Sequence, residues 1–118
     1  MTLIARIEAA GPEDQASLLL DAAIEISNGS WGADKIMAFD WMLDAKAYES
    51  AALMLVPDEH RYLLDKRSRA DRRQDGYRAN VWQAPAVEYE ATLSWARTPA
   101  LAIAAAALKA RAAKEGER

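Results

Sequence analysis

Few residues of this chain have types and spacings that could support catalysis. Asp40 and Asp44 stand four residues apart, so on a helix their carboxylates would share one face and could bind a divalent cation. His60 follows Asp58 and Glu59 and could act as a general base. No third carboxylate or histidine is spaced to join the aspartate pair, and the chain has no glycine-rich phosphate loop. We therefore predict a protein that is not an enzyme, with no catalytic residues, no bound metal and no cofactor.

The amino-acid composition excludes further classes of site and of protein. The chain has 118 residues, one histidine and no cysteine, so a disulfide, a thiolate metal site and a cysteine nucleophile are excluded. Its 52% hydrophobic and 28% charged residues are typical of one folded domain, which we place at 1–118. No apolar run approaches the roughly 20 residues that cross a bilayer, and the N-terminus lacks the order of a signal peptide. The sequence thus predicts a cytoplasmic protein without membrane contact.

Acidic and basic residues are distributed unevenly along the chain. Residues 1–59 hold eleven acids and three bases, whereas residues 60–118 hold seven acids and twelve bases. The densest basic stretch, 66–73, contains four arginines: Arg67, Arg69, Arg72 and Arg73. Such a cluster could bind the phosphates of a nucleic acid. The acidic isoelectric point of about 5.2 instead favours an exposed hairpin tip.

The chain also has four tryptophans, which a core this small does not bury easily: Trp31, Trp41, Trp82 and Trp95. Tryptophan and arginine are the residues that most often anchor interfaces. The segment 30–44 is strongly apolar but follows no single period, so a helix, a strand and a packed loop all remain open there. Trp82 is predicted on the strand face opposite Tyr77 and Val81.

Helix-capping and helix-breaking residues predict where the helices begin and end. Apolar residues at spacings of three and four after Thr2 predict a first helix that ends before Gly11-Pro12. A second helix begins at Pro12 and ends at Asn28-Gly29, because both residues tolerate left-handed backbone angles. The same signals predict a central helix over 45–56 with Asp44 as its cap, and a C-terminal helix over 99–113 that Thr98 caps.

Between the last two helices the period changes to two. The pattern predicts strands over 60–66, 77–82 and 87–95, with a turn at Asp75-Gly76. In the third strand every odd position is apolar, so we expect the odd positions to face the core. Short connections favour an antiparallel meander over parallel crossovers. The predicted fold class is α+β, a three-stranded antiparallel meander sheet packed by helices.

Three segments resemble the small phage ABA sandwich domain, a family of protein domains that occurs in bacteriophages and prophages. They cover 3–12, 47–57 and 96–111, and their sequences are LIARIEAAGP, AYESAALMLVP and ARTPALAIAAAALKAR. The family keeps this order, with a LIARLEAATGP start, an AALTLVP helix end and an ATPALALCAAALRARA finish. The resemblance implies a phage origin, and hence the host cytosol, together with a layered fold of helices and strands. It brings no catalytic residue or cofactor to this chain.

These observations predict a non-catalytic phage or prophage accessory protein that binds a host or phage protein. The candidate partner-binding residues are acidic, basic and aromatic: Trp31, Asp34, Asp40, Trp41, Asp44, Arg67, Arg69, Arg72, Arg73 and Trp82. The aspartates together with Glu49 could imitate a nucleic-acid backbone and so inhibit a host defence complex.

Three alternatives stay open. One is a virion-associated or self-assembling structural protein, and another is a homodimer whose interface is its main feature. The third is a nucleic-acid-binding module, because the order of helix, three strands and helix matches double-stranded-RNA-binding domains. The start of the last helix, at Thr98-Pro99, carries none of the lysines that such domains use, which disfavours nucleic acid.

Overall fold

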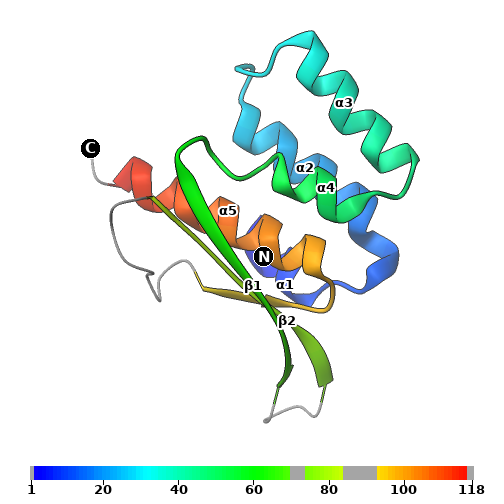
Figure 1. The fold of residues 1–118 in the computed structure, drawn as a ribbon, viewed down its shortest axis with the longest axis vertical. Helices are drawn as coiled ribbons and strands as arrows, with labels where there is room; N and C mark the ends of the chain where they lie inside the picture. Colours follow the sequence, from blue (N-terminus) through cyan, green and yellow to red (C-terminus); the bar gives the residue numbers. More distant parts are fainter. Residues whose placement is uncertain (1, 70–73, 84–92, 117–118) are drawn as a thin grey trace.

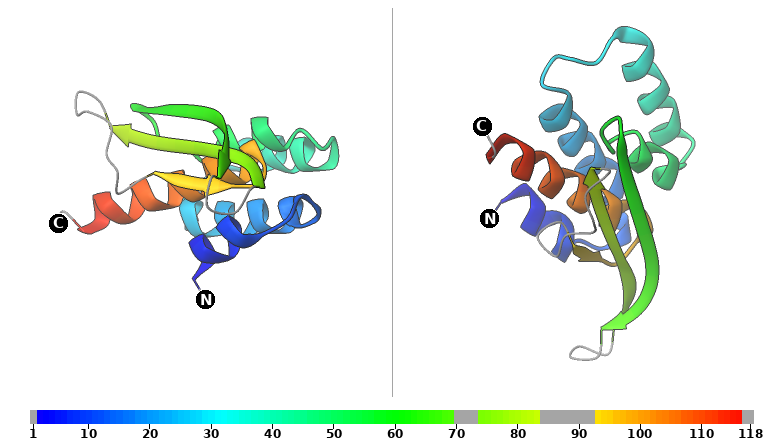
Figure 2. Two further views of the ribbon diagram at one scale, coloured as in Figure 1. Left: turned by 90° about the horizontal axis from the view of Figure 1, so that it is seen from below. Right: turned by 60° about the vertical axis from the view of Figure 1, so that its left-hand side comes forward.

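The C-terminal helix α5 (Pro99–Gly116) lies at the centre of the fold. The computed structural model, which describes residues 2–69, 74–83 and 93–116, packs α5 against the sheet and against the helices α1, α2 and α4 (Figures 1 and 2). Residues 100–108 of α5 are all buried, and six of them are alanines, whose small side chains allow neighbours to approach on every side. The predicted C-terminal helix is confirmed and extends three residues beyond 113.

Two helices open the chain, as predicted, although the α-helical part of the second begins at Gln15 and not at Pro12. The hydroxyl of Thr2 accepts a hydrogen bond from the Ala5 amide at 3.1 Å and begins α1 (Leu3–Ala9). A short 3-10 turn, η1 (Pro12–Asp14), leads into α2 (Gln15–Ser27). Asn28, at φ 42°, ends α2 in the left-handed conformation.

The segment that the sequence left open forms a helix, α3 (Ala33–Asp44), which packs mainly against α4 (Tyr48–Leu53). The prediction of one central helix from residue 45 with Asp44 as its cap is wrong, because Asp44 is the last residue of α3. Lys46, at φ 60°, turns the chain out of the helical path, so α4 begins only at Tyr48.

The sheet is the predicted antiparallel meander. It has the order β1-β2-β3, with β1 (His60–Arg69), β2 (Gln74–Gln83) and β3 (Ser94–Ala96). The predicted turn at Asp75-Gly76 is wrong, because both residues lie within β2 and Gly76 pairs with Arg67. A Cβ atom at position 76 would overlap the indole of Trp95. The absence of a side chain at Gly76 therefore allows Trp95 to pack against β2, and the strand continues through this residue.

The third strand contacts the core with different residues from those predicted. Most of the predicted strand, 84–92, lies outside the described residues. In the part that is described, Ser94 and Ala96 are buried, whereas Leu93 and Trp95 are only partly buried. The register places Ser94 beside Ala79, on the sheet face that packs against α5. The expectation that odd positions face the core is therefore wrong here, because small residues let β3 approach α5.

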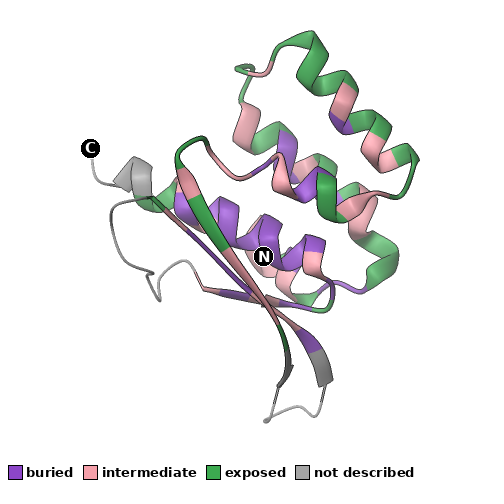
Figure 3. Ribbon diagram, viewed as in Figure 1, coloured by how far each residue is buried: buried purple, intermediate pink, exposed green. Residues whose placement is uncertain are grey.

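The core runs along α5 and into the helices around it (Figure 3). Its largest fully buried apolar side chains come from six elements or their ends: Ile7, Leu19, Phe39, Leu55, Val81, Leu101 and Ile103. Among the helices of the described ranges, none has both the length and the apolar character needed to cross a bilayer.

Candidate functional site

One face of α3 points to solvent and combines aromatic, apolar and acidic side chains. Met37 and Trp41 lie four residues apart on this face and are 60% and 75% exposed, and Ile36 beside them is 47% exposed. Figure 3 shows α3 as a largely exposed helix at the edge of the molecule. We call the following residues the outer face of α3: Asp34, Ile36, Met37, Asp40, Trp41 and Asp44.

The opposite side of α3 holds the helix on the protein. Phe39 is 2% exposed, and Trp31 meets it edge-on with the ring centroids 5.6 Å apart. The ammonium of Lys35 lies 4.6 Å from the centroid of the Trp31 ring. Trp31 therefore packs at the start of the helix and does not join Trp41 on the outer face, although the sequence grouped the two as candidates.

The three aspartates of the outer face are all exposed, and Glu49 is exposed on the neighbouring helix α4. Asp40 and Asp44 share a face of α3, as their spacing predicts. Within the described part of the chain, no three histidine, aspartate or glutamate side chains come together as a metal site. Ca²⁺ takes six to eight oxygen ligands, more than one aspartate pair offers. The arrangement is that of an acidic, solvent-exposed surface.

Of the remaining candidates, Arg67, Arg69 and Trp82 belong to the strands β1 and β2. The backbone of Arg67 and Arg69 belongs to β1, whereas Arg72 and Arg73 lie outside the described residues. Trp82 is partly buried in β2 and pairs with Arg61, on the face opposite Tyr77 and Val81 as predicted. The structure thus places the described candidates in three settings: the outer face of α3, the opposite side of that helix, where Trp31 packs, and the strands β1 and β2.

A hollow of about 490 Å³ lies where α2, α3, the loop after α4, β1 and α5 meet. Its charged and titratable lining consists of Lys35, Asp58, His60 and Arg111, and apolar residues such as Ile26 and Met54 line it as well. Sequence reasoning missed this site, because its residues are scattered from position 26 to position 111. Two of its residues, Trp31 and His60, were candidates in the sequence, but the sequence alone could not connect them to Arg111.

Comparison of the sequence with protein-family models gives no match, and comparisons with curated proteins and with solved structures give none either.

Proposed function

We propose that this protein is a non-catalytic accessory protein that binds another protein through the outer face of α3. The observation that carries the proposal is the exposure of Trp41, Met37 and Ile36 on one helix. Tryptophan in particular is enriched among the residues that dominate binding energy. Anchors four residues apart on a helix are the pattern by which a helix binds in a groove of its partner.

The charge of the outer face indicates the chemistry of that partner. Asp34 and Asp44 lie toward the two ends of the exposed helix face, and Asp40 lies beside Trp41. Complementary potentials give specificity and speed association, so the partner surface should be an apolar groove rimmed by lysine or arginine. Binding should weaken as salt concentration rises, because exposed charges are screened.

A protein that binds nucleic acid presents a groove lined by lysine and arginine. We therefore include inhibition of a host defence complex in the proposal, with the aspartates of α3 and Glu49 of α4 occupying the groove in place of phosphates. The resemblance of three segments to the small phage ABA sandwich domain supports a phage or prophage setting for this role.

The test compares the full-length chain with surface variants in affinity capture from bacterial lysate, followed by binding measurements on the purified partner. Trp41→Ser removes the main anchor, and Asp40→Lys reverses one charge. Two matched controls lie on α2: Ile24→Ser removes an apolar side chain that is 62% exposed, and Glu25→Lys reverses an exposed charge. None of these side chains belongs to the buried core.

The proposal holds if a partner is retained by the wild type and by both α2 variants but is lost with Trp41→Ser and weakened by Asp40→Lys. It fails if no partner is captured, or if the captured partner binds Trp41→Ser as well as the wild type. Sedimentation of the same proteins gives a further decisive outcome. A homodimer that Trp41→Ser dissociates would replace the heterologous partner with self-assembly.

A further inference from the structure

The hollow between α2, α3 and α5 has the size and position of a ligand site. Its volume of about 490 Å³ falls within the range of roughly 300–1,000 Å³ that small-molecule sites occupy. Five segments from distant parts of the chain converge on it, and such junctions bring together side chains that no single element could supply. The hollow is separate from the outer face of α3, because Lys35 and Trp31 lie at the start of that helix on the side where Phe39 is buried.

The charged lining favours an anion. Lys35 and Arg111 are cationic, and Asp58 is the one acidic side chain among the described residues that line the hollow. Contact with the Trp31 ring holds the Lys35 ammonium at the rim. A guanidinium carries five N–H donors, so an arginine such as Arg111 can bind an oxyanion and a protein group at the same time.

His60 adds an imidazole ring to the lining. Its Nδ1 lies 3.1 Å from the carbonyl oxygen of Asp58, which can only accept, so Nδ1 carries the hydrogen of this bond. The other ring nitrogen, Nε2, remains for a hydrogen bond to a ligand.

The rest of the lining is apolar. Ile26 from the end of α2 and Met54 and Leu55 from the end of α4 contribute carbon surface beside the charged groups. Sites for small molecules combine such surface with a few polar groups that fix orientation. We propose that this hollow binds a small organic anion, in which a phosphate or carboxylate head contacts Arg111 and Lys35 and an apolar body contacts Ile26 and Met54.

Calorimetric titration of the full chain tests the proposal with four probes. Phenyl phosphate and phenylacetate carry the two possible heads on the same apolar body, inorganic phosphate is a head alone, and benzyl alcohol is a body alone. Arg111→Gln and Lys35→Gln remove the two cations in turn. Arg97→Gln and Lys46→Gln are matched controls at exposed positions outside the hollow.

We expect saturable binding of phenyl phosphate or phenylacetate, and the tighter of the two identifies the head. Each single variant in the hollow should weaken that binding about ten-fold, the usual consequence of losing one hydrogen bond to a charged group. The controls should bind as the wild type does. Lys35 is exposed, so Lys35→Gln provides a folded test even if Arg111→Gln lowers stability.

The absence of saturable binding of both aromatic anions would overturn the proposal. Binding that Lys35→Gln leaves unchanged, or that Arg97→Gln weakens equally, would show attraction to general positive charge and would also overturn it. If benzyl alcohol binds as tightly as the two aromatic anions, the hollow is only an apolar cavity and the proposal of an anion site is wrong.

Discussion

At the scale of single residues, the contact between Gly76 and the Trp95 ring requires a residue without a side chain at position 76. The sequence pattern Asp75-Gly76 is typical of a turn, yet β2 passes straight through it and the indole of Trp95 occupies the space beside the glycine. A glycine can therefore mark a close approach between strands as well as a turn.

Replacing this glycine should destabilise the protein. Gly76→Ser places a Cβ atom against the Trp95 ring, and we expect it to lower the free energy of unfolding by about 1–3 kcal/mol, the usual cost of overpacking. Gly32→Ser is the matched control, because no atom lies within 4 Å of its Cβ position and serine is a preferred N-cap residue. Urea denaturation compares the two. Equal losses would show that the Trp95 contact is not the cause.

The two helix-capping threonines differ in their surroundings. Thr98 is buried, and its hydroxyl accepts a hydrogen bond from the Leu101 amide at 3.2 Å, whereas Thr2 makes the same bond at an exposed end. We expect Thr98→Ala to cost about 1–2 kcal/mol and Thr2→Ala a few tenths, because water replaces the lost partner of an exposed amide. Thermal unfolding measures both, and Thr98→Ser should restore most of the loss. A larger loss for Thr2→Ala would contradict this ranking.

At the scale of elements, α3 has two opposite faces with different tasks. Phe39 is 2% exposed and attaches the helix, whereas Trp41, two residues later, is 75% exposed. A helix with large apolar side chains on both sides does not follow the simple amphipathic pattern. This is the physical reason why the sequence from 30 to 44 fitted no single period.

Substitutions on the two faces of α3 should therefore differ in their effect on the free energy of unfolding. Phe39→Ala should lower the free energy of unfolding by about 3 kcal/mol or more, the usual cost of truncating a buried phenylalanine. Trp41→Ala should change it by no more than about 0.5 kcal/mol, as is usual for surface positions. Chemical denaturation checks both values. If Trp41→Ala is as destabilising as Phe39→Ala, Trp41 contributes to folding, and its role as a docking residue is rejected.

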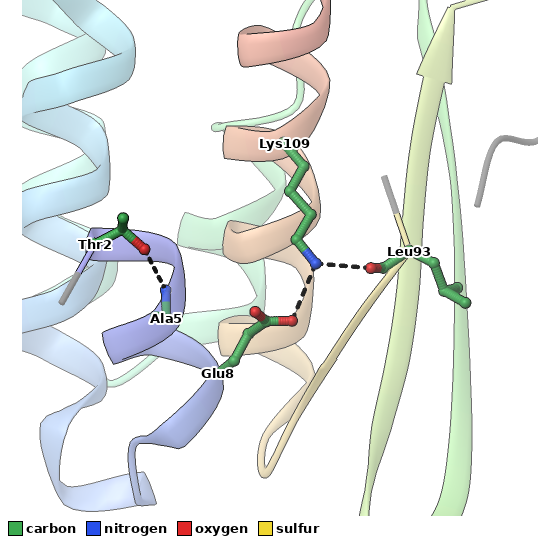
Figure 4. A network of polar contacts seen from close by, with 5 residues as sticks. All are labelled: Thr2, Ala5, Glu8, Leu93 and Lys109. Carbon is green, nitrogen blue, oxygen red and sulfur yellow. Dashed lines mark hydrogen bonds and ion pairs between the residues drawn. The ribbon is translucent and has the colours of Figure 1, made fainter. Parts of the chain in front are cut away.

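At the scale of the whole molecule, Lys109 connects segments that are far apart in the sequence. From the middle of α5, its ammonium donates to Glu8 Oε2 on α1 at 3.1 Å and to the carbonyl oxygen of Leu93, just before β3, at 2.8 Å (Figure 4). The Lys109 and Glu8 side chains are 23% and 32% exposed, so solvent screens this ion pair less than a fully exposed one.

A double-mutant cycle on Glu8→Gln and Lys109→Met should give a coupling of about 1 kcal/mol, because the pair is partly buried and close. The matched control is the ion pair of Arg6 with Asp21, where the atoms are 3.6 Å apart and the side chains are 50% and 44% exposed. Its cycle with Arg6→Met and Asp21→Asn should give less than about 0.5 kcal/mol. Equal coupling in the two cycles would contradict the bridging role of Lys109.

The sequence alone determined the features that depend on neighbouring residues. The Thr2 and Thr98 caps, the left-handed end at Asn28 and the period-two strands around Val81 are local effects, so the α+β class and the meander were predictable. Tertiary structure alone decided the course of β2 through Gly76, the burial of Ser94 rather than Trp95, and the separation of Trp31 from Trp41. It also assembled Lys35, His60 and Arg111 around one hollow. Each of these depends on which distant side chain fills the adjacent space, and a pattern along the chain carries no such information.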